Sequence, residues 1–335
     1  MTRPAHHRDG QFQNNHGDFE PKSLAEVIRW KWNAARQGLP KRPQAPIPTQ
    51  TPDLGFIRAN TSQPAVTWIG HATVLAQLGG LNLLTDPIFS ERASPVSFAG
   101  PRREQPPGIA LAGLPHIHAV LVSHNHYDHL DLPSCRALAC QPGGSPLFVV
   151  PLGLQSWFRA RGIERVVELD WWQSERLHDV DIFLVPAQHW SARGLNDRMK
   201  TLWGGFAVFA PDCQLFFAGD TGYSRDFADI RERFAERQQS SQGGGFDIAL
   251  IPIGAYEPRW FMQSQHVNVE EALNIHADLG AKRSLGVHWG SFELTDEALD
   301  EPPRQLAAQR PSRGLTEDQF FTLAIGETRR LPTRR

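Results

Sequence analysis

Cysteine is scarce in this chain, with three residues among 335, namely Cys135, Cys140 and Cys213. The number is odd and no two of them form a C-x-x-C pair, a combination that does not suit a disulfide scaffold. It suits reduced thiols in a cytoplasm, where cellular reductants keep most cysteines reduced. We therefore expect the three side chains to serve only in packing.

Long uncharged hydrophobic runs are also absent, and no apolar segment follows the N-terminal methionine. Both absences argue against a membrane-spanning helix and against a secretory signal. The net charge is −2 and the lysines and arginines are scattered, which argues against nucleic acid as a partner. We expect a cytoplasmic protein, with peripheral contact at the inner membrane surface as the only membrane association.

The composition favours one large domain preceded by an N-terminal arm. A hydrophobic content of 40% supports a substantial core in a chain of this length. We place the arm at residues 1–64 and the compact domain at residues 65–335. Residues 1–20 are polar and are predicted to be disordered, which makes His6 and His7 tail residues rather than part of a site.

Residues 22–37 are predicted to form an amphipathic helix within this arm. Leu24 and Ile28 recur at helical spacing among basic side chains. Trp30 and Trp32, together with the cations, suit either peripheral membrane contact or packing on the domain. A proline-rich stretch follows and should run as an extended strap over the surface.

The remainder of the chain alternates short β-rich runs with a few helical patterns. Glycine, proline or aspartate separates the runs, as is typical of strand ends. Strands that feed helices in two successive halves suit an α/β (α+β) fold, with two sheets face to face and helices outside, a four-layer αββα sandwich. The helical patterns cover residues 132–139, 153–161, 224–236 and 269–279.

The segment SHNHYDHLD carries three imidazoles and a carboxylate within six residues, directly after an apolar run. His124, His126, Asp128 and His129 are nitrogen and oxygen donors at a spacing that suits metal binding. A solvated polar loop would be the alternative. The density of ligand-type side chains favours the metal site.

Three more donors stand at the ends of later β-like runs, His189, Asp220 and His288. Each of them alone could be an ordinary hydrogen-bonded residue at the rim of a sheet. Together with the four earlier donors they make a set of seven, because strands that end at one rim bring such residues into one cleft. Seven nitrogen and oxygen donors can hold two adjacent transition-metal ions and leave room for water.

The order of these motifs resembles that of the metallo-β-lactamase superfamily. Further segments resemble its N-acyl-phosphatidylethanolamine-hydrolysing phospholipase D branch, namely WIGHATVLAQLGG, ELDWW, FAGDTGY, IPIGAYEPRWF and HWGSFEL. The resemblance runs from about Trp68 to near the C-terminus. One departure is the long polar link ERQQSSQGGG between Glu236 and Gly245.

The resemblance implies two zinc ions, with iron or manganese as alternatives. His124, His126 and His189 would hold one ion, Asp128, His129 and His288 would hold the other, and Asp220 would bridge them. Two such cations lower the pKa of a shared water to near neutrality and stabilise charge on a phosphoryl group. Asp128 and Asp220 would therefore be catalytic as well as ligating.

Four more residues are candidates for supporting roles. Asp86 and His71 fall at strand ends, where they could orient histidine ligands, or they could be a turn residue and a rim histidine. Tyr127 could aim its hydroxyl at the substrate or simply pack. His266 could donate a proton or contact a phosphate oxygen, or it could serve in helix capping.

The sequence thus predicts a metal-dependent phosphodiesterase that acts on a phospholipid of the N-acyl phosphatidylethanolamine type or on a small phosphodiester. A lactonase or small-ester hydrolase with the same metals is the first alternative. A membrane-surface binding module that docks through residues 22–37 is an alternative of another class. A homodimer is compatible with the sequence.

Overall fold

In the computed structural model the β-rich runs form two large sheets, each with seven strands among the described residues. The structure describes residues 4–16, 19, 22–194, 196–238 and 244–334. In spatial order, the first sheet comprises β16 (Thr328–Arg330), β3 (Ala65–Gly70), β4 (Thr73–Leu78), β5 (Leu81–Thr85), β6 (Ala119–Leu121), β7 (Leu147–Pro151) and β8 (Val166–Leu169). The second comprises β15 (Phe320–Phe321), β14 (Ser284–Val287), β13 (Ile248–Pro252), β12 (Gln214–Phe217), β11 (Gly205–Phe209), β10 (Val180–Val185) and β9 (Ser174–Leu177).

Side-chain alternation along the strands separates two hydrophobic cores. In β6, Ala119 and Leu121 belong to the large core between the sheets, while Val120 belongs to the core under the outer helices. Successive side chains of a strand point to opposite faces of the sheet, so each central strand needs apolar residues at every position. This explains the continuous apolar runs in the sequence.

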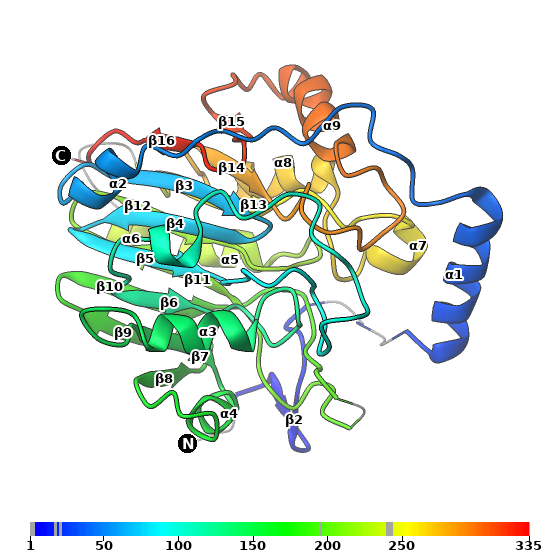
Figure 1. The fold of residues 1–335 in the computed structure, drawn as a ribbon, viewed down its shortest axis with the longest axis horizontal. Coiled ribbons are helices and arrows are strands. Elements are labelled where there is room, and N and C mark those ends of the chain that lie inside the picture. The colour runs from blue at the N-terminus through cyan, green and yellow to red at the C-terminus, as the bar shows by residue number, and fades with distance from the viewer. Residues whose placement is uncertain (1–3, 17–18, 20–21, 195, 239–243, 335) are drawn as a thin grey trace.

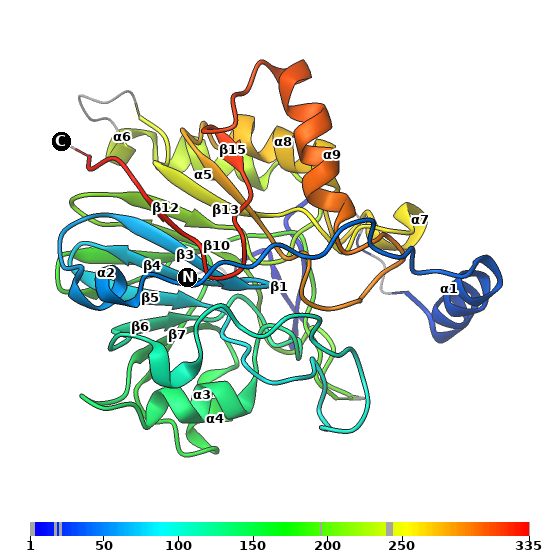
Figure 2. The same cartoon turned by 45° about the horizontal axis from the view of Figure 1, so that its top comes forward.

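Helices cover the outer face of each sheet (Figures 1 and 2). On the first sheet lie α2 (Leu54–Ala59), α3 (Leu132–Ala139) and α4 (Gln155–Arg159). On the second lie α5 (Asp226–Arg233), α6 (Ala235–Gln238), α8 (Val269–Asp278) and α9 (Glu301–Gln309). Parallel pairs such as β6 with β7 and β13 with β14 need crossover helices of this kind. The predicted αββα sandwich is confirmed.

Most of the predicted elements are present, and the missed ones are short or polar. The four helices predicted within the compact domain correspond to α3, α4, α5 with α6, and α8. Neither α9, which begins Glu-Pro-Pro, nor the polar edge strand β9 was predicted from the sequence. Two of the cysteines are buried as expected, but Cys140 is exposed. The unusual polar link falls partly outside the description, since residues 239–243 are not among the described ones.

The predicted disorder of residues 1–20 is wrong for residues 4–16, which we call the N-terminal clasp. It contains the short strands β1 (His7–Arg8) and β2 (Gln11–Phe12). The Nε2 atoms of His6 and His7 lie 2.7 and 2.9 Å from the two carboxylate oxygens of Asp170, and the His6 ring packs on Trp171. A largely buried carboxylate needs polar partners, and this polar segment supplies them, so neither histidine is a tail residue.

Helix α1 (Leu24–Gln37) stands apart from the sandwich in both views (Figures 1 and 2). A capping box of Ser23 and Glu26 starts it. Trp30 is buried against Phe261 and donates a hydrogen bond from Nε1 to Asp296 Oδ2 at 2.8 Å. None of the helices among the described residues has the length and the apolar composition needed to span a bilayer.

The two tryptophans of α1 give a matched test of how the helix is held. Trp30 is 7% exposed and Trp32 is 64% exposed. Trp30→Ala should cost about 3 kcal/mol of docking energy, because a buried aromatic ring is lost, and should raise the rate of tryptic cleavage within α1 roughly a hundredfold. Trp32→Ala should leave that rate nearly unchanged. Equal cleavage rates for the two variants would contradict this account of the docking.

Candidate metal centre

The predicted donors follow strands that end at the same end of the sandwich. The motif with His124 and His129 follows β6, His189 follows β10, Asp220 follows β12 and His288 follows β14. In α/β folds the loops at the carboxyl ends of strands build the ligand sites. Here such loops from both sheets meet over the seam between them.

The first donor group consists of three imidazoles. His124 Nε2 lies 2.8 Å from His126 Nδ1, and His189 Nε2 lies 3.3 Å from the same atom. The three rings offer one nitrogen each within 4.8 Å of one another. The side chains of His124 and His189 are almost completely buried.

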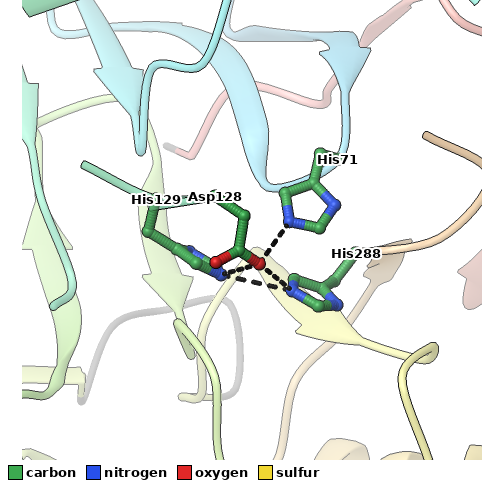
Figure 3. Close-up of side chains that lie close together, drawn as sticks. All are labelled: His71, Asp128, His129 and His288. Atoms are coloured by element: carbon green, nitrogen blue, oxygen red, sulfur yellow. Dashed lines mark hydrogen bonds and ion pairs between the residues drawn. The ribbon is translucent and has the colours of Figure 1, made fainter. Parts of the chain in front are cut away.

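The second donor group lies beside the first (Figure 3). His129 Nε2 lies 3.2 Å from His288 Nε2, and Asp128 Oδ2 lies 3.3 and 3.4 Å from these two nitrogens. His71 approaches from β3, with Nε2 at 3.0 Å from the same carboxylate oxygen. The second group therefore contains one residue that the resemblance did not count as a ligand.

The carboxylate of Asp220 lies between the two groups. Its Oδ2 atom is 3.0 Å from His129 Nε2, 3.9 Å from His124 Nε2 and 4.0 Å from His189 Nε2. Its Oδ1 atom is 3.2 Å from His288 Nε2. This position is the one that a bridging ligand needs.

Hydrogen bonds to the far side of three rings fix which nitrogen faces the centre. The Ser123 hydroxyl donates to Asp86 Oδ2 at 2.6 Å, so it accepts from His124 Nδ1 at 2.9 Å. His189 Nδ1 donates to the carbonyl of Gln265 at 3.0 Å, and His129 Nδ1 lies 2.6 Å from Asp86 Oδ2. Partners of this kind are typical of metal-binding histidines.

The donor set fits a cation. In their neutral forms, His124 and His189 carry the ring proton on Nδ1, so both Nε2 lone pairs point at His126 Nδ1. Among the described residues, the buried Nε2 of His126 and Oδ1 of Asp220 have no hydrogen-bond partner. Converging lone pairs and a carboxylate are favourable around a metal ion and unfavourable without one.

The electrostatics of the two groups differ. Burial lowers the pKa of His124 and His189 well below the usual value and lowers that of His126 to about 4. For His288, burial acts in the same direction, but the carboxylates of Asp220 and Asp128 outweigh it and raise its pKa to about 9. The imidazoles of the first group are thus neutral near pH 7, because burial outweighs the nearby carboxylates, which raise these pKa values.

Asp86 and His71 both lie where supporting partners belong. Asp86 Oδ1 also accepts the main-chain N–H of Ser123 at 2.7 Å, so one carboxylate orients two successive parts of the motif. His71, Asp86 and His288 have φ values of 55°, 31° and 61°, a left-handed region that non-glycine residues rarely adopt. Such strain concentrates at functional sites.

Tyr127 and His266 take different positions. The Tyr127 hydroxyl donates to the Arg193 carbonyl at 2.9 Å, so it is already engaged, while the Arg193 guanidinium stacks on the ring at 4.0 Å. His266 Nδ1 lies 3.9 Å from Asp220 Oδ2 and is buried without a hydrogen-bond partner among the described residues. The structure thus brings His266 to the centre, while the contacts of the Tyr127 side chain are with Arg193.

Three supporting residues were missed from the sequence: Ser123, Gln265 and Arg193. The Arg193 Nη1 atom donates to the carbonyls of Asn125 at 2.8 Å and Leu130 at 2.7 Å, which brackets the ligand loop. Ser123 and Gln265 directly precede His124 and His266 in the sequence, and this proximity could have identified them. For Arg193, in a polar loop, there was no signal.

Comparison with known proteins agrees with the fold and identifies a family. Residues 81–289 match the family described as the beta-lactamase superfamily domain. The N-acyl-phosphatidylethanolamine-hydrolyzing phospholipase D 1 of Caenorhabditis elegans is 41% identical over 273 residues, which cover 78% of this chain and 74% of that protein. The mitochondrial N-acyl-phosphatidylethanolamine-hydrolyzing phospholipase D of Saccharomyces cerevisiae is 37% identical over 78% of this chain and 55% of its own length.

Among solved structures, an isothiocyanate hydrolase from Delia radicum gut bacteria superposes with a TM-score of 0.61. The two share 21% sequence identity, and the superposition covers 79% of this chain and 98% of that one. This likeness concerns the fold alone. The family match and the identity to the worm enzyme go further, and they show that this chain is a metal-dependent hydrolase of the metallo-β-lactamase superfamily, in the branch of the N-acyl-phosphatidylethanolamine-hydrolysing phospholipases D.

Proposed function

We propose that this protein is a dinuclear zinc phosphodiesterase that hydrolyses N-acyl phosphatidylethanolamine-type phospholipids to a fatty-acid ethanolamide and phosphatidic acid. The observation that carries the proposal is the position of the Asp220 carboxylate, within 4.0 Å of donor nitrogens of both groups. The printed names of the worm and yeast relatives supply the substrate class.

The chain's own residues divide the work at this centre. His124, His126 and His189 would hold one ion, Asp128, His129 and His288 the other, and Asp220 both. His71 would orient Asp128 through its contact with the same carboxylate oxygen, Oδ2. When bound, two zinc ions would supply Lewis acidity for a phosphoryl oxygen and an activated water. His266 lies beside Asp220 and would donate a hydrogen bond to the substrate phosphate.

A cavity of about 580 Å³ beside the ligand loop supports a lipid-like substrate. Tyr127 joins its wall to the loop, Trp157 and Val96 offer apolar surface, and Arg161 and Arg193 offer positive charge. A phosphodiester with an acyl chain has both an anionic and an apolar part. The lining also includes Arg92 and the carboxylates of Glu91 and Asp131, so it combines charged and apolar side chains, as the site for an amphipathic molecule needs.

The proposal is tested with a substrate panel and one isosteric variant. Purified enzyme should contain zinc and should hydrolyse an N-acyl phosphatidylethanolamine and a soluble phosphodiester chromogen, but not a lactone. Asp220→Asn should lose one ion and more than about a hundredfold in turnover, because the bridging carboxylate is lost. Metal analysis also distinguishes zinc from iron and manganese.

Two results would count against the proposal. A lactone that is hydrolysed faster than either phosphodiester would assign the centre to ester chemistry. Full turnover with two bound ions in Asp220→Asn would show that this carboxylate does not bridge.

His266 gives a second, sharper test of the chemistry. His266→Ala should keep both ions and the melting temperature but lower kcat by roughly a hundredfold, the usual effect of losing a positioned proton or hydrogen-bond donor. His266→Asn keeps a donor that cannot act as an acid, so recovery of most of the rate would assign hydrogen bonding. Unchanged turnover in the alanine variant would mean that His266 takes no part.

We also propose that α1 contacts lipid at a membrane surface. Leu24, Ile28 and Trp32 recur every four residues and are 75%, 60% and 64% exposed, so they form one apolar stripe on the helix. Arg29 and Arg36 lie on the same helix and suit anionic headgroups. Because the relatives are hydrolases, this contact would add to the enzyme and not replace it.

Substitution of the stripe tests this contact without disturbing the buried face of α1. The triple variant Leu24→Ser, Ile28→Ser and Trp32→Ser should lose most co-sedimentation with vesicles that contain anionic lipid, while hydrolysis of a soluble phosphodiester stays the same. Ala25→Ser, at an exposed position of the same helix, is the matched control. Undiminished vesicle binding, or a wild-type dimer that the triple variant dissociates, would refute the membrane role.

A further inference from the structure

Asn14, in the N-terminal clasp, holds the main chain of His189 from both sides. Its Oδ1 atom accepts the His189 N–H at 3.0 Å, and its Nδ2 atom donates to the His189 carbonyl at 3.0 Å. These are the hydrogen bonds that the main chain of His189 makes within the described part of the chain. The side-chain amide thus satisfies the N–H and the carbonyl of His189, as the main chain of a neighbouring strand would.

The Asn14 amide is itself fixed from behind. Trp203 Nε1 donates to the same Oδ1 atom at 3.1 Å and also to the Ala187 carbonyl at 2.9 Å. Trp203 is buried in the core between the sheets. The amide is therefore tied to the core and not only to the loop that it contacts.

The rest of the clasp is anchored at both ends (dark blue in Figure 1). At one end His6 and His7 bond to Asp170, which follows β8 of the first sheet. The distances of 2.7 and 2.9 Å are hydrogen-bond lengths, so this cluster fastens the segment. At the other end Asn15 donates to Asp226 on α5 at 3.0 Å.

His189 depends on this support because it lies beyond the end of β10, outside any strand. The preceding residue, Gln188, forms an isolated bridge with Gly222. The ring of His189 is oriented by the Gln265 carbonyl, but the backbone from which the ring projects is oriented by Asn14. A metal-binding histidine needs both its ring orientation and its backbone position to be fixed.

We propose that the N-terminal clasp is a positioning element of the metal centre, and that Asn14 sets the ligand geometry of His189. This inference rests on the proposed function in one respect, that His189 holds a metal ion. Outer partners of metal ligands usually contribute 10- to 100-fold to metal affinity. Loss of Asn14 should therefore lower the affinity of the first donor group for its metal ion about tenfold.

Neighbouring asparagines provide the test. Zinc affinity is measured by competition with a chromogenic chelator in the full-length wild type, Asn14→Ala and Asn15→Ala. Asn14→Ala should bind one ion about tenfold more weakly, and zinc should raise its melting temperature less than it does in the wild type. Asn15→Ala loses an amide contact of the clasp to α5 but none to His189, so its zinc affinity should match the wild type.

The outcomes separate positioning from simple stabilisation. A purely structural role would lower the melting temperature of the metal-free protein and leave both zinc affinity and the zinc-induced increase unchanged, which would overturn the inference. If Asn14→Ala does not fold, the double variant His6→Ala and His7→Ala loosens the clasp at its far end. Unchanged zinc affinity in that variant would also overturn it. Wild-type protein that binds no metal would instead refute the proposed function.

Discussion

The buried carboxylate of Asp220 is the interaction on which the rest of the site depends. A charge removed from water is costly unless partners surround it, and here imidazoles from three different loops lie within 4.0 Å. Although burial alone would raise it, the rings of His129, His288 and His266 hold the pKa of Asp220 well below its usual value. The loops at the carboxyl ends of the strands in the two sheets must therefore keep their relative positions. A shift of either sheet would leave this charge without its partners.

Backbone strain accompanies this packing of charged and polar groups at the centre. His71 and His288 come from different sheets and both adopt left-handed φ values. The main chain of His288 donates to the His71 carbonyl at 3.0 Å, and Ser291 Oγ accepts from the His71 N–H at 2.7 Å. These hydrogen bonds stabilise the strained conformations of His71 and His288. Such conformations persist in folded proteins only where the surrounding structure fixes them.

Segments outside the matched family region extend this centre toward the N-terminus. Residues 81–289 match the family, yet His71, Asn14 and α1 all precede them in the chain. His71 orients Asp128 and Asn14 supports the His189 loop, while α1 presents its apolar stripe away from the core. Polar, weakly patterned sequence can therefore contact the centre when its partners lie on a preformed rim.

The sequence alone determined the long apolar strands, the helix of residues 22–37, the four helical segments of the domain and a set of seven donors that the structure gathers at one end of the sandwich. Apolar periodicity is local information, and so is a cluster such as His124 to His129 within one loop. Only the tertiary structure decided that Asn14 reaches His189, that Arg193 brackets the ligand loop and that His6 pairs with Asp170. These contacts join residues far apart in sequence, and polar side chains carry no periodicity that reveals a distant partner. Their geometry exists only once both sheets have packed.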